Sequence, residues 1–135
     1  MAWIINTGLD EMLDDFRRLG DAAGEVQEKM IAAGVEILKE EWRKSAEGHR
    51  HKDTGAMIKS IGASGVKRDG SAVFSIVYPD GKDKTGTRNA EKAFILNYGT
   101  SKIKASHWVE EAEEAAEPLI MEAYLKIWDE HIKGE

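Results

Sequence analysis

Residues 21–47 read DAAGEVQEKMIAAGVEILKEEWRKSAE and hold the longest helical pattern that no proline interrupts. Apolar side chains recur there with the period of about 3.6 residues that an α-helix imposes. They form one stripe: Val26, Met30, Ala33, Ile37, Leu38 and Trp42. The opposite side is charged and suits contact with water. The stretch predicts a long amphipathic helix that must pack its apolar side against another element.

A second long helix is predicted near the end of the sequence, from residue 106 to about residue 132. One apolar stripe holds Ala112, Ala116, Leu119, Ala123 and Ile127, with Trp108, Ile120, Tyr124 and Trp128 beside it. Pro118 lacks a backbone N–H and disfavours helical geometry at the residue before it, so a kink or break is expected there.

The middle of the chain contains a β-strand pattern at residues 72–78. Val73, Ser75 and Val77 alternate with Phe74, Ile76 and Tyr78, which is typical of a strand with two unlike sides. Residues 65–67 are expected to pair with it in antiparallel fashion, because residues 68–71 read RDGS and suit a tight hairpin turn.

Three shorter helices complete the expected elements. The first follows Thr7 as N-cap and would bury Leu9, Met12, Leu13 and Phe16. The second covers residues 54–61, with Met57, Ile58 and Ile61 facing inward. Residues 90–98 suit a buried strand or a short helix, and Asn89 as N-cap with Gly99 at the end favours the helix. Helices and an antiparallel sheet in separate segments predict an α+β fold.

Length and composition limit the class of protein. The 135 residues are 41% hydrophobic and 33% charged, which predicts one compact domain over residues 1–135. The absence of cysteine excludes a disulfide scaffold, a thiolate metal site and a cysteine nucleophile, and favours an intracellular protein. No apolar run approaches the roughly 20 residues of a membrane span, so a soluble protein without membrane contact is expected.

The net charge of −6 hides an uneven distribution. Residues 1–45 hold 6 bases and 10 acids, residues 46–105 hold 11 and 6, and residues 106–135 hold 2 and 9. Two basic loops are expected, at residues 49–52 and 79–92, and their candidate assembly residues are Arg50, Lys52, Lys82, Lys84 and Arg88. The turn-rich segment 79–89 is expected to be weakly ordered. Such an asymmetry steers association with a polyanion or with the acidic side of another copy.

No catalytic, cofactor-binding or metal site is predicted. Asp53 begins the sequence DTGA, which also marks aspartic proteases, but the cations just before it would keep its carboxylate solvated and ionised. A hydrolase built on Asp53 therefore stays as a minor alternative to helix capping. His49 and His51 have the spacing of a metal-binding pair, yet a third ligand is not evident nearby.

A small nucleic-acid-binding module is the main alternative function. Its bases would be those of loops 49–52 and 79–92 together with Lys67, Arg68, Lys102 and Lys104. Stacking platforms need exposed aromatic rings among such bases. The patterning of Phe74, Tyr78, Phe94 and Tyr98 instead predicts core positions, so non-specific phosphate contact is favoured over sequence readout.

The order of these elements carries a family resemblance. Residues 54–61 read TGAMIKSI and residues 93–101 read AFILNYGTS, with a hairpin between them and a long helix after them. The chain resembles the tail-component, or tail-completion, family of long-tailed bacteriophages and prophages, whose members sit at the head–tail junction. Family members usually carry Glu where this chain has Asn97, and often Pro and Phe near Ser106 and Trp108.

The resemblance implies a small curved antiparallel β-sheet packed against the long N- and C-terminal helices. It also implies a non-enzymatic structural protein of the virion neck or tail, without cofactor, assembled in the host cytoplasm. The implied partners are other copies in a ring, hexameric by the resemblance, and the neighbouring neck and tail-tube proteins, with DNA nearby. The isolated protein is expected to be a monomer. Gly55, Gly99 and Thr100 are assigned to backbone geometry.

Overall fold

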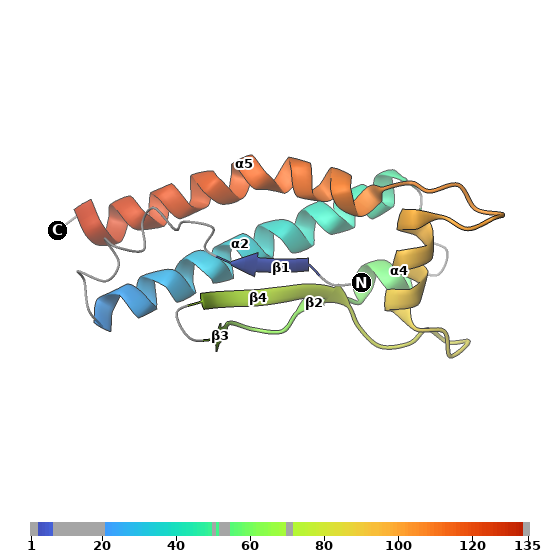
Figure 1. Cartoon of the computed structure of the whole chain (residues 1–135), viewed down its shortest axis with the longest axis horizontal. Helices are drawn as coiled ribbons and strands as arrows, with labels where there is room; N and C mark the ends of the chain where they lie inside the picture. The colour runs from blue at the N-terminus through green and yellow to red at the C-terminus, as the bar shows by residue number, and fades with distance from the viewer. Residues whose placement is uncertain (1–2, 7–20, 50, 52–54, 70–71, 134–135) are drawn as a thin grey trace.

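Two long antiparallel helices dominate the computed structural model, which describes residues 3–6, 21–49, 51, 55–69 and 72–133 (Figure 1). Helix α2 spans Asp21–Gly48 and helix α5 spans Trp108–Trp128. A π-helical turn, η1 (Asp129–Lys133), continues from α5. Both long helices predicted from the sequence are therefore confirmed.

The two helices pack closely because large and small side chains alternate between them. Trp42 and Trp108 are fully buried, and their rings meet edge to face with centroids 5.5 Å apart, an arrangement that aromatic rings prefer. Ala112 and Ala116 of α5 are also buried. A Cβ on Gly34 would lie 3.1 Å from the Tyr124 hydroxyl oxygen, so glycine permits the close approach there.

The structure differs from two expectations for α5. No break occurs at Pro118, because the helix continues through it; Pro118 lies on the exposed side, where water can hydrate the carbonyl that proline leaves without a helical donor. Leu119, placed in the core stripe by its spacing, is 44% exposed. The apolar side that faces α2 consists instead of Trp108, Val109, Ala112, Ala116, Tyr124 and Trp128.

A small antiparallel sheet lies on the side of α2 opposite α5 (Figure 1). Its central strand, β4 (Ala72–Pro79), pairs along one edge with β1 (Trp3–Asn6) and along the other with β2 (Ile61–Ala63) and β3 (Lys67–Asp69). The β3–β4 pairing confirms that a hairpin is present, but the partner strand is Lys67–Asp69 rather than residues 65–67, so Arg68 and Asp69 belong to the strand and not to the turn. Val73, Ser75 and Val77 are buried, as the alternation predicted, and the fold is α+β.

Strands β1 and β2 were not predicted. Both have only three or four residues, too few for an alternating pattern to be recognised. Ile61 is buried as expected but belongs to β2, because the preceding helix α3 covers only Ala56–Lys59. The N-terminal helix expected after Thr7 lies outside the described residues.

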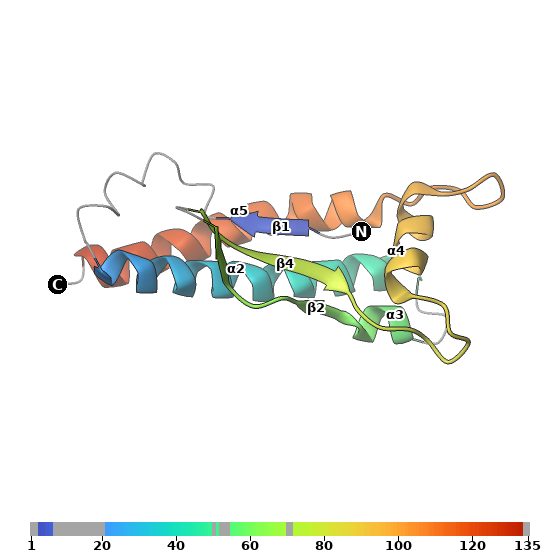
Figure 2. The same cartoon turned by 60° about the horizontal axis from the view of Figure 1, so that its bottom comes forward.

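Helix α4 (Asn89–Tyr98) confirms the helix predicted for residues 90–98 and lies with α3 at one end of the long helices (Figure 2). Asn89 is not its N-cap, however. Arg88 holds that position, and the buried Asn89 side chain instead donates a hydrogen bond from Nδ2 to the Asp80 carbonyl at 2.8 Å. Asn89 thus fixes the preceding loop rather than the helix start.

The end of α4 and the start of α5 cap each other around Asn97, which is fully buried. Its Oδ1 accepts from the Val109 N–H at 2.9 Å, and its carbonyl accepts from the His107 N–H at 3.0 Å. Its Nδ2 donates to Glu110 Oε1 at 3.2 Å. The indole N–H of Trp108 donates to the Ala93 carbonyl at 3.3 Å. Helix ends leave such groups unpaired, and here each helix satisfies the other.

Replacing Asn97 by Ala is expected to lower the free energy of unfolding by about 2 kcal/mol, because a buried N–H loses its acceptor. Thermal or urea unfolding measures the loss. Amide hydrogen exchange at Val109 should also accelerate. Asn89→Ala is the matched control, since it removes another buried asparagine that does not touch α5. If amide hydrogen exchange at Val109 were unchanged in the Asn97→Ala variant, the Asn97 side chain would not be capping α5.

Within the residues that the structure describes, no helix combines the length and the apolar character needed to cross a membrane.

Candidate functional site

Three segments meet at the end of the molecule that holds α4: the loop at residues 80–88, α4 itself, and the loop at residues 99–107 (Figures 1 and 2). Residues 79–107 hold six bases and three acids. The exposed side chains here, which we name the α4 surface, include the following: Lys82, Lys84, Arg88, Phe94, Tyr98, Lys102, Ile103 and Lys104.

The first loop is organised by Asp83. One carboxylate oxygen of Asp83 accepts from the N–H groups of Thr85 and Thr87, both at 2.9 Å, and from the Thr85 hydroxyl at 2.7 Å. The other forms an ion pair with Lys92 of α4. The hydrogen bond with Lys92, followed by that with Thr85, holds the pKa of Asp83 well below its usual range. The expectation of a weakly ordered loop is not supported.

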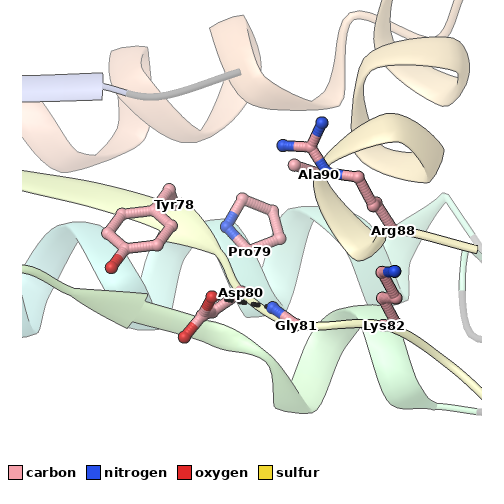
Figure 3. A pocket seen from close by; sticks show the side chains of 7 residues that line it. All are labelled: Tyr78, Pro79, Asp80, Gly81, Lys82, Arg88 and Ala90. Carbon is pink, nitrogen blue, oxygen red and sulfur yellow. Dashed lines mark hydrogen bonds between the residues drawn. The ribbon is translucent and has the colours of Figure 1, made fainter.

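A hollow of about 430 Å³ lies at the neck of this loop. In Figure 3, the Tyr78 ring and the Asp80 carboxylate lie toward one end of it, and Lys82 and Arg88 lie toward the other. Lys82 and Arg88 form an isolated antiparallel bridge between the two arms of the loop. Both side chains are exposed, so the neck presents two cations to anything that binds there.

Among the candidate assembly residues, Lys82, Lys84 and Arg88 therefore share one loop at the α4 surface. None of the three forms an ion pair with another described residue. Arg50 and Lys52 lie outside the described residues, as does Asp53. The structure thus brings together only the second of the two predicted basic loops.

The aromatic residues of α4 correct the sequence interpretation. Phe94 and Tyr98 are 52% and 51% exposed rather than buried, and their rings contact each other at a tilt of 50° with centroids 4.8 Å apart. They lie four residues apart on the outer side of α4, together with Arg88 and Glu91. The sequence analysis did not predict this exposed pair. The buried side of α4 includes Ala93 and Asn97, and a buried asparagine is not recognisable from a hydrophobic pattern.

The second loop is closed by local backbone contacts. Gly99 has a φ of 78°, and a Cβ there would lie 2.6 Å from the Ile103 carbonyl oxygen, so only glycine fits. Thr100 Oγ1 accepts from the N–H groups of Lys102 and Ile103, at 3.2 and 3.1 Å. These contacts hold Lys102, Ile103 and Lys104 outward beside α4. Gly55 also has a positive φ, of 77°, and is the N-cap residue of α3.

The histidines at the end of α2 are held by the start of α5. His49 pairs with Glu111, and His51 Nε2 lies 2.9 Å from Ser106 Oγ. Burial and the neighbouring His49 ring lower the pKa of His51. Among the described residues, no three His, Asp or Glu side chains are grouped as metal ligands would be. The two histidines therefore join α2 to α5.

The glutamates at the start of α5 lie where negative charge stabilises the helix. Glu110 and Glu111 lie in the first turn, where the helix dipole favours negative charge. Burial, and then repulsion by Glu110, raise the pKa of Glu113 to about 7. Glu113 is thus partly protonated at neutral pH, which lowers the repulsion within this acidic group.

Comparison with known proteins identifies a family. Over residues 10–111 the chain matches the family described as "Bacteriophage HK97-gp10, putative tail-component". The chain belongs to this family of bacteriophage tail components. The resemblance seen in the sequence is thereby confirmed, and membership indicates a structural component of the phage tail. Neither a curated protein nor a solved structure gave a significant match.

Replacing Asp83 by Ala is expected to open the first loop. The amides of Thr85 and Thr87 lose a charged acceptor, and their hydrogen exchange should accelerate about tenfold. Because the pKa of Asp83 is lowered in the folded state, protection should persist as pH falls below the usual carboxyl range and disappear only in stronger acid. Asp80→Ala, which removes an acceptor from Gly81 alone, is the control. Equal exchange in both variants would contradict this role.

Proposed function

We propose that the protein is a structural component at the phage head–tail junction, where it completes or joins the tail. It does so by forming a ring with itself and with neighbouring neck and tail proteins. Family membership supports the tail assignment. It takes its place in the virion after assembly in the host cytoplasm, and neither catalysis nor a cofactor is part of this role.

The observation that carries the proposal is the separation of charge between two parts of one chain. The α4 surface is basic, with five exposed lysines and arginines that form no ion pair with another described residue: Lys82, Lys84, Arg88, Lys102 and Lys104. Helix α5 carries six acids and one base. The helix begins beside α4 and then runs away from it along the molecule (Figure 1).

Such a separation suits a ring. A cyclic ring larger than a dimer needs a heterologous interface, in which one surface of a copy matches a different surface of the next copy. Opposite charges on the two surfaces fix the order of copies and disfavour contacts between identical surfaces. A protein whose charges were evenly mixed over its surface would not favour one order of copies over another.

Electron micrographs of particles produced without this protein test the role. Separate full heads and finished tails are expected if it joins the two, and tails of abnormal length are expected if it terminates the tail. Normal joined particles would contradict the proposal.

Ring formation by the purified protein should weaken as salt rises from about 0.05 to 0.5 M, because screening shortens the range of charge interactions. Triple replacement of Lys82, Lys84 and Arg88 by Glu should have a larger effect than salt. Lys67→Glu is the control, since Lys67 is an exposed lysine of β3, which lies away from α4 (Figure 1). Oligomers that ignore both salt and the triple replacement would contradict the charge-ordered interface.

A nucleic-acid-binding module is the second candidate, and the exposed pair of Phe94 and Tyr98 rings favours it. Exposed rings can stack on bases, while Lys102 and Lys104 of the following loop contact phosphates. Fluorescence anisotropy at low salt tests it with single-stranded and duplex DNA. Binding that falls several-fold in Phe94→Ala/Tyr98→Ala would support this function, and absence of binding to either DNA would remove it.

A further inference from the structure

Two groups of exposed apolar side chains remain after the helices and sheet have packed. One comprises Phe94 and Tyr98 on the exposed side of α4, with Ile103 exposed on the loop that follows the helix. The other comprises Met121 and Leu125 of α5, which are 44% and 48% exposed and lie one helical turn apart on the same side of the helix. We name the second group, with the glutamates beside it, the α5 surface. Exposed apolar groups with polar surroundings are typical of interaction sites.

The two groups have opposite charged surroundings. Arg88 at the start of α4 and Lys102 and Lys104 on the loop after it are exposed, with Glu91 as the exposed acid of α4. Glu114, Glu117 and Glu122 are exposed on α5 near Met121 and Leu125, with Lys126 as its exposed base. Each surface thus combines an apolar pair with charged neighbours, and the charges of the two surfaces are opposite, as in complementary protein interfaces.

The two surfaces also lie apart on the molecule. Met121 and Leu125 belong to the second half of α5, whereas α4 contacts the beginning of that helix through Asn97 (Figure 1). One chain therefore cannot cover its own α5 surface with its α4 surface. A second copy can, and it leaves one surface of each kind free at the ends of the pair.

We propose that the α4 surface of one copy docks on the α5 surface of a second copy. The aromatic pair contacts Met121 and Leu125, and the lysines and arginine of one surface face the glutamates of the other. This interface rests on the ring proposed above and specifies which surfaces form it. Because the contact is heterologous, it repeats from copy to copy and closes when the rotation allows.

Cysteine cross-linking tests the docking, since the natural chain has no cysteine to interfere. Tyr98→Cys and Leu125→Cys proteins are mixed under mild oxidation at low salt. A disulfide between the two variants is expected to form at least about tenfold faster than between unrelated surface positions, because docking raises their effective concentration. It should also form faster than either variant links to itself, and more slowly at high salt.

Glu36→Cys supplies the matched control, because Glu36 is exposed on α2 outside both surfaces. If Tyr98→Cys links to Glu36→Cys as fast as to Leu125→Cys, the docking is wrong. Preferred self-linking of Tyr98→Cys would overturn it in favour of a symmetric contact between α4 surfaces. Circular dichroism confirms that each half-exposed position tolerates cysteine.

The same variants separate this interface from the junction role. Specific cross-linking together with normal joined particles in the absence of the protein would preserve the docking and reject the role. Absence of specific cross-linking, together with particles that fail to join without the protein, would preserve the role and reject the docking.

Discussion

The buried carboxamide of Asn97 is the contact on which the arrangement of this end of the molecule depends. It accepts the N–H of Val109, the second residue of α5, and donates to Glu110, while the Asn97 backbone carbonyl accepts from the N–H of His107. A helix end without such partners costs stability, so α4 and α5 hold each other at a fixed angle. Everything exposed on α4, the aromatic pair above all, takes its direction from this junction.

The long elements were predictable because their apolar side chains repeat over many turns, as in the stripe from Val26 to Trp42. Burial of those stripes decides the structure, and the periodic spacing of apolar residues in the sequence shows which side of each helix is buried. Short strands are decided by their partners instead. Ile61 looks like the end of a helix until β4 is present to pair with it. Pro118 was expected to interrupt α5, but packing of the residues on both sides keeps the helix continuous.

The positive charge of the site was predictable from the sequence, but its exposed apolar side chains were not. Lysines of a turn-rich loop lie at the surface in almost any fold, so Lys82 and Lys84 could be assigned from composition. Phe94 and Tyr98 could not, because an aromatic residue in a helix usually faces the core. Their exposure follows from Asn97, which takes the buried position that an apolar residue would normally hold. A buried polar group in one place thus accounts for exposed rings in another.

The antiparallel pair of α2 and α5 has a mechanical consequence. At about 1.5 Å per residue, the 28 residues of α2 extend roughly 42 Å, and a second helix packed along them resists bending. Proteins that bind at opposite ends of the helix pair are held at a fixed distance from each other. A force applied at one end is transmitted to the other through the helices and not through flexible loops. In a phage tail, each copy would act as a rigid spacer.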